Sequence, residues 1–126
     1  MRVLLVDDEK ELVSAMAERL AFRGIEADWV TDGRQAVEKA KSTPYDVIVL
    51  DVKMPGASGH AVMETIKRFL PRAGFVFLTG HTSVEDKARG EAAGAAFYLM
   101  KPLKIDILVE KLKAAAEAAK EKPHGT

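Results

Sequence analysis

Polar side chains suited to binding a metal ion or a phosphoryl group come just after apolar runs in this 126-residue chain. They are Asp7 and Asp8 after residues 3–6, Asp51 after residues 46–50, Thr79 after residues 75–78, and Lys101 shortly after residues 95–99. Carboxylate oxygens are ligands that Mg²⁺ prefers, and an ammonium group can bind a phosphoryl oxygen. If the apolar runs are parallel strands, their carboxyl ends share one edge of a sheet, and these side chains meet in one crevice.

A crevice of this composition favours phosphoryl chemistry. Clustered carboxylates raise one another's pKa, and a divalent cation relieves their repulsion. Phosphoryl transfer depends mainly on positioning and on neutralising charge. A carboxylate can also act as a nucleophile and form an acyl phosphate. The pattern therefore predicts a magnesium site with a carboxylate that could accept a phosphoryl group.

The elements that must position these residues follow two alternating patterns. Short apolar runs predict strands over residues 3–6, 25–30, 46–50, 75–78 and 95–99. Helical spacing predicts helices over residues 9–23, 34–42, 59–70, 83–93 and 104–121, with a loop over residues 52–58. Apolar strands between amphipathic helices are typical of a parallel sheet covered on both faces. We expect one α/β domain over residues 1–120 and a flexible tail over residues 121–126.

Composition argues against several other classes of protein. The 19 basic and 19 acidic residues give a net charge of about zero, so no global basic field favours nucleic acid or an anionic membrane. The chain has no cysteine, which excludes disulfides, thiolate catalysis and cysteine-bound zinc. No apolar run approaches the roughly 20 residues that span a bilayer. With no signal-peptide layout at the N-terminus, a cytoplasmic location is expected.

Four motifs in order resemble a known family. They are VDDE over residues 6–9, LDVKMPGASG over residues 50–59, LTG over residues 78–80 and GAAFYLMKPL over residues 94–103. Together they resemble the receiver domain of bacterial two-component response regulators, and the resemblance covers residues 2 to about 120. It implies a single (βα)5 fold of the flavodoxin-like or chemotaxis-regulator type, with a five-stranded parallel sheet in the order 2-1-3-4-5.

The resemblance also implies the chemistry of the acidic residues. Asp51 would accept a phosphoryl group from the phosphohistidine of a sensor histidine kinase or of a phosphotransfer protein. Asp8 would bind Mg²⁺ (or Mn²⁺) directly, with Asp51 as a further carboxylate ligand and Asp7 acting through water or a nearby contact. The backbone carbonyl of Lys53 would complete the protein ligands. Glu9 is expected to start the first helix and could also reach the site.

The phosphoryl oxygens would have four further partners by the same resemblance. Thr79 and Lys101 would bind them through their side chains, and Val52 and Gly80 through backbone amides. Pro102 corresponds to the family's proline after a cis peptide bond, which would aim the Lys101 side chain; cis bonds before proline cost little.

A switch and its tuning are implied as well. Thr79 would move to the phosphoryl group, Tyr98 would turn inward, and the face of the fourth helix, fifth strand and fifth helix would be remodelled. That face would serve an output domain, an effector or a homodimer. Lys53 and His81 would flank the acyl phosphate and slow its hydrolysis.

Other interpretations stay open at this stage. A magnesium-dependent phosphatase with Asp51 as nucleophile would need a second acid two residues on, where Lys53 stands. A receiver-like interaction module that is never phosphorylated would be suggested by a lost acidic or lysine position, and none is missing. Asp7 and Asp8 could simply favour a helix start. His60 is expected to be solvated.

Overall fold

The computed structural model describes residues 1–80 and 84–121, and five helices and seven strands occur in these ranges. The strands are β1 (Arg2–Val6), β2 (Glu26–Val30), β3 (Val47–Leu50), β4 (Lys53–Met54), β5 (Ala57–Ser58), β6 (Gly74–Thr79) and β7 (Phe97–Met100). The helices are α1 (Lys10–Ala21), α2 (Gly33–Ser42), α3 (Gly59–Phe69), α4 (Val84–Ala92) and α5 (Ile105–Lys120). The expected flexible tail falls almost entirely outside the described residues.

Five of the strands form one parallel sheet in the order β2-β1-β3-β6-β7. This is the predicted 2-1-3-4-5 order, counted over the strands of that sheet, so the predicted α/β fold is confirmed. In a parallel sheet all strands end at one edge, and the side chains that follow β1, β3, β6 and β7 meet there.

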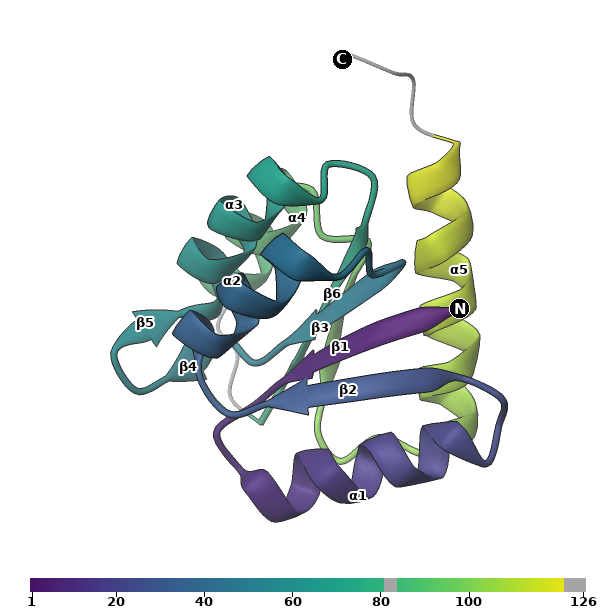
Figure 1. Cartoon of the computed structure of the whole chain (residues 1–126). Helices are drawn as coiled ribbons and strands as arrows, with labels where there is room; N and C mark the ends of the chain where they lie inside the picture. Colours follow the sequence, from purple (N-terminus) through teal and green to yellow (C-terminus); the bar gives the residue numbers. More distant parts are fainter. Residues whose placement is uncertain (81–83, 122–126) are drawn as a thin grey trace.

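Side chains alternate between two apolar layers. Val3 and Leu5 of β1 pack in a cluster with α1 and α5, whereas Leu4 and Val6 pack in a cluster with α2 and α3. Figure 1 shows α1 and α5 on one side of the sheet and α2, α3 and α4 on the other. Because β3 and β6 are buried along their whole length, polar residues on them are tolerated only at the strand ends.

The segment predicted as a loop over residues 52–58 contains a small antiparallel hairpin. Lys53 pairs with Ser58 and Met54 with Ala57, and Gly56 makes the turn with a φ of 82°. This hairpin, labelled β4 and β5, projects beside the sheet in Figure 1. The Ser58 hydroxyl then accepts a hydrogen bond from the Ala61 N–H (3.2 Å) and caps α3.

The expectation for His60 was wrong. This residue lies on the first turn of α3, is only 3 % exposed, and packs against the ring of Phe77. It lies three positions before the buried Met63, so it is on the buried face of α3.

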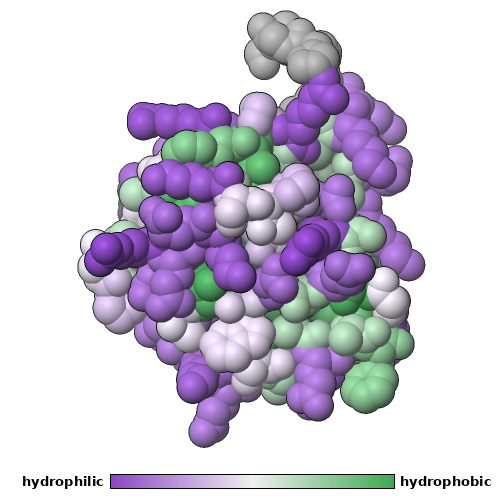
Figure 2. Space-filling model, in the orientation of Figure 1, coloured by the Kyte–Doolittle hydropathy of each residue, from purple (hydrophilic) through white to green (hydrophobic). Residues whose placement is uncertain are grey.

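One face of the molecule is mainly polar. Figure 2 shows hydrophilic side chains over most of the visible face, with small apolar groups between them. Within the described ranges, no helix has both the length and the apolar character that a bilayer crossing requires.

Candidate functional site

Three carboxylates converge where β1 and β3 end. Asp7, Asp8 and Asp51 each present an oxygen, and these oxygens all lie within 4.8 Å of one another. The convergence follows from the register, because Val6 pairs with Leu50 and the next residues on both strands are acidic. Asp7 is 6 % and Asp51 7 % exposed, whereas Asp8 is open to solvent. Oxygen donors in this arrangement fit a hard divalent cation such as Mg²⁺.

The Lys101 ammonium lies between the two buried carboxylates. Its Nζ donates to Asp7 Oδ2 at 2.6 Å and to Asp51 Oδ2 at 3.1 Å. A backbone hydrogen bond from the Lys101 N–H to the Thr79 carbonyl (2.8 Å) joins this segment to the end of β6. The Lys101–Pro102 peptide bond is cis, the geometry expected at this position.

Burial and charge perturb both Asp7 and Lys101. Burial raises the pKa of Asp7, and this outweighs the lowering by the Lys101 ammonium and the Glu9 N–H. Burial alone would lower the pKa of Lys101, but the hydrogen bonds and charges of Asp7 and Asp51 raise it above its ordinary value. Both pKa values are raised for a consistent reason. One ammonium is shared among several carboxylates, so Lys101 holds its proton tightly while the charge of Asp7 is only partly neutralised. The crowded negative charge would favour a bound cation.

The backbone after β3 is packed tightly against the start of α3. The Gly59 N–H donates to the Val52 carbonyl at 2.8 Å, and a Cβ on Gly59 would lie 2.2 Å from the Asp51 carbonyl oxygen. The Lys53 N–H donates to Asp51 Oδ1 at 3.2 Å, while the Lys53 side chain is exposed. The Asp51 carboxylate is therefore held by its own loop on one side and by Lys101 on the other.

Thr79 and Gly80 lie at the same sheet edge. Thr79 is the last residue of β6 and is 1 % exposed, whereas Gly80 is exposed, and a Cβ added to it would meet nothing within 4 Å. The space that a side chain at position 80 would occupy is therefore open. His81 lies outside the described residues.

The Tyr98 ring is turned toward the core. The residue is half-buried, its hydroxyl oxygen is shielded from solvent, and its ring centroid lies 5.4 Å from that of Phe77.

Glu9 extends the acidic cluster beyond the three carboxylates. It precedes α1 but makes no side-chain capping hydrogen bond. Its Oε1 lies 3.9 Å from Lys101 Nζ, and its N–H donates to Asp7 Oδ1 at 3.0 Å. The adjacency in VDDE was the sequence signal for this contact, although the sequence favoured a helix start as the main role of Glu9.

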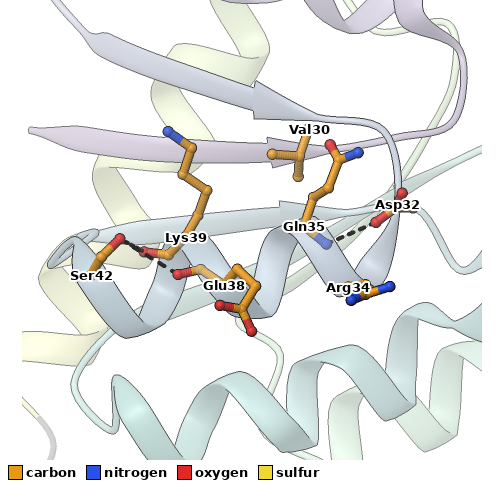
Figure 3. Close-up of a pocket in the computed structure, with 7 residues that line it drawn as sticks. All are labelled: Val30, Asp32, Arg34, Gln35, Glu38, Lys39 and Ser42. Carbon is orange, nitrogen blue, oxygen red and sulfur yellow. Dashed lines mark hydrogen bonds between the residues drawn. The ribbon is translucent and has the colours of Figure 1, made fainter.

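Two open grooves flank different parts of the molecule. One, of about 550 Å³, runs between α1 and α5 beside the site and includes Glu9, Met16, Lys101 and Leu103 in its lining. The other, of about 600 Å³, lies along α2 next to the end of β2, where Asp32 caps the helix by accepting the Gln35 N–H at 2.8 Å (Figure 3). The α2 groove contains none of the predicted site residues.

Comparison with known proteins gives a consistent result. The family model described as the response regulator receiver domain matches residues 3–113. The chain is 35% identical over 114 residues to the transcriptional activator protein IrlR of Burkholderia pseudomallei, covering 90% of this chain and 49% of that protein. It is 36% identical over 114 residues to the transcriptional regulatory protein TcrA of Mycobacterium tuberculosis, covering 90% of this chain and 45% of that protein. The chain thus spans about half the length of these curated relatives.

Solved structures show the same architecture. A CheY-like receiver domain protein from Methanospirillum hungatei superposes with a TM-score of 0.90 at 25% identity, covering 97% of this chain and 98% of that one. The beryllofluoride-activated NtrC4 receiver domain gives a TM-score of 0.87 at 34% identity, covering 94% and 98% of the two chains. The family match, the shared fold and the carboxylates at the strand ends lead to one conclusion: this chain belongs to the response regulator receiver domains of two-component signalling.

Proposed function

We propose that Asp51 is the residue that accepts the phosphoryl group in this receiver. The observation that carries the proposal is the position of its buried carboxylate, held by Lys101 and beside Asp7 and Asp8 at the ends of adjacent strands. An Asp51 oxygen attacks the phosphorus of a phosphohistidine, the P–N bond breaks, and the imidazole leaves with its electron pair and takes up a proton. The donor is a sensor histidine kinase or a phosphotransfer protein.

Mg²⁺, or Mn²⁺ in its place, is the proposed metal. Asp8, Asp51 and the Lys53 carbonyl would hold it, with Asp7 acting through water. When bound, the ion neutralises phosphoryl oxygen charge. The convergence of three carboxylates at one solvent-accessible point supports this assignment.

The remaining side chains at the sheet edge are assigned to the phosphoryl oxygens. Lys101 supplies an ammonium that already lies 3.1 Å from the acceptor carboxylate, so a small movement places it on a transferred group. Thr79 supplies a hydroxyl, and Val52 and Gly80 supply backbone N–H groups. The open space beside Gly80 supports the last of these.

Signal output would use the face formed by α4, β7 and α5. Phosphorylation draws Thr79 toward Asp51, stabilises the inward ring of Tyr98, and shifts α4 between two positions. An output domain, an effector or a second copy of the chain then reads that face. The relatives are about twice as long as this chain, which supports an output domain elsewhere in a longer protein. The chain itself acts as a signalling receiver. It would hydrolyse its own acyl phosphate only slowly.

A mass measurement tests the acceptor directly. Incubation with acetyl phosphate and Mg²⁺ should add one phosphoryl group to the chain, and the Asp51→Asn variant should gain none. Asp106→Asn, which changes an exposed aspartate on α5, should behave like the unchanged chain. Phosphorylation that persists in Asp51→Asn would contradict the assignment, and repeated turnover of phosphomonoesters would favour a phosphatase.

A further inference from the structure

Three aromatic rings form a column inside the α2–α3–α4 side of the sheet. The ring centroids of His60 and Phe77 lie 4.8 Å apart, and those of Phe77 and Tyr98 lie 5.4 Å apart. Phe77 is fully buried and His60 is 3 % exposed. These distances are typical of directly packed aromatic pairs, so the three rings form one continuous contact.

The column adjoins the segment that carries Asp51 through Gly59, the residue before His60, and through the Phe77 ring. Gly59 precedes His60 at the start of α3, and a Cβ on Gly59 would lie 2.2 Å from the Asp51 carbonyl oxygen and 3.1 Å from Phe77 Cε1. The Asp51 backbone, the first turn of α3 and the Phe77 ring are therefore packed without spare room. A shift of the Asp51 backbone must be taken up by its neighbours.

The column also lies against α4. Gly90 is a buried glycine within this helix, and a Cβ there would lie 3.0 Å from Tyr98 Cδ2 and 3.3 Å from Phe77 Cδ2. Glycine is an unfavourable residue in a helix interior. Its presence at position 90 is explained by the Tyr98 ring, which occupies the space that a larger side chain would need. Beyond Gly90, Lys67 Nζ of α3 donates to the Ala93 carbonyl at 2.6 Å and holds the end of α4.

We propose that His60 is a positioning residue that couples the Asp51 backbone to the seat of α4 on Tyr98, through the ring of Phe77. The coupling rests on the proposed acceptance of a phosphoryl group by Asp51 and adds a route that does not pass through the Thr79 side chain. Its physical basis is steric, because densely packed rings cannot shift one at a time. Because Gly90 has no side chain, α4 packs directly against the Tyr98 ring, and the position of the helix depends on the position of that ring.

A double-mutant cycle tests this coupling. The affinity for beryllofluoride in the presence of Mg²⁺ is measured by ¹⁹F NMR in the unchanged chain, His60→Leu, Gly90→Ala and the double variant. The added Cβ at Gly90 crowds the inward Tyr98 ring, so Gly90→Ala should bind the phosphoryl mimic more weakly. The affinity of the double variant should differ from the product of the single effects by about threefold or more.

Two further variants separate coupling from general damage to the core. His60→Phe keeps an aromatic ring and should preserve the coupling to Gly90. Met63→Leu alters another fully buried residue of α3, and its effect should simply multiply with that of Gly90→Ala. Multiplicative behaviour of His60→Leu, or equal coupling from Met63→Leu, would overturn the inference. Failure of the unchanged chain to take a phosphoryl group on Asp51 would instead refute the proposed function.

Discussion

Lys101 is the residue on which the charge balance of the site depends. Its ammonium contacts Asp7 and Asp51 while its side chain is 15% exposed, so two buried carboxylates share one counter-charge. The sequence placed all three residues at strand ends, which was enough to predict that they would meet. It could not predict the ion pairs themselves, because side-chain conformations depend on packing that no local pattern encodes.

Replacing Lys101 by Met should destabilise the metal-free chain by about 1–3 kcal/mol, since the buried carboxylates lose a charged hydrogen-bond donor. Mg²⁺ should restore more stability to this variant than to the unchanged chain, because the cation then replaces the missing charge. Urea unfolding with and without Mg²⁺ measures both effects. Lys104→Met, at an exposed position before α5, is the control. Equal stability of the two variants without metal would contradict the expectation.

Lys53 is expected to slow hydrolysis of the acyl phosphate. Its side chain is exposed while its N–H donates to Asp51, so it can lie over the acceptor without being part of the core. Lys53→Ala should speed loss of the phosphoryl group about 2- to 10-fold, a barrier change of up to about 1.4 kcal/mol. The decay of the phosphorylated mass after removal of the donor gives the rate. Lys39→Ala on α2 should leave the rate unchanged, and His81→Ala is expected to act like Lys53→Ala.

At the scale of elements, the sequence predicted every strand of the main sheet and every helix to within a few residues. It missed the β4–β5 hairpin because two-residue strands are too short to show a period of two. It also missed the burial of His60, although the three-residue spacing from Met63 placed the side chain on the buried face of α3. The prediction for His60 followed its polar residue type and not its helical spacing, which indicated burial.

Gly56, in the turn of the hairpin, and Gly59, just after it, should respond differently to substitution. Gly59→Ala places a Cβ against the Asp51 carbonyl, so it should lower stability by about 1–3 kcal/mol and reduce phosphorylation by acetyl phosphate. Gly56→Ala meets no atom within 4 Å but has a positive φ, so it should cost about 1–2 kcal/mol and leave phosphorylation largely intact. Thermal unfolding and mass measurement compare the two. Equal loss of phosphorylation would contradict the role given to Gly59.

At the scale of the whole molecule, a polar contact far from the site links neighbouring strands toward the opposite edge of the sheet. The Tyr45 hydroxyl, just before β3, donates to Asp28 of β2 at 2.6 Å, and Arg2 of β1 also pairs with Asp28. Burial, followed by the hydrogen bond to the Asp28 carboxylate, raises the pKa of Tyr45 to about 12. No sequence pattern indicated this contact, since it joins two strands and the segment before a third that are distant in sequence.

The raised pKa of Tyr45 predicts a pH dependence of folding. The folded state holds the phenol proton more tightly than the unfolded state, so the contribution to stability is complete below about pH 10 and is lost as pH rises toward about 12. Chemical unfolding across this range should show a steeper decline for the unchanged chain than for Tyr45→Phe, by about 1–3 kcal/mol. Parallel curves for the two proteins would rule out this contribution.

The hydrogen bond from Lys101 to Asp7 joins residues 94 positions apart in the chain. During synthesis, Asp7, Asp8 and Asp51 all emerge from the ribosome long before their counter-charge does. The Asp51 carboxylate therefore lacks its ammonium until the last strand of the sheet has been made and has added to the edge of β6. If Asp51 is the acceptor, a kinase that requires the assembled site would discriminate against chains that end before Lys101.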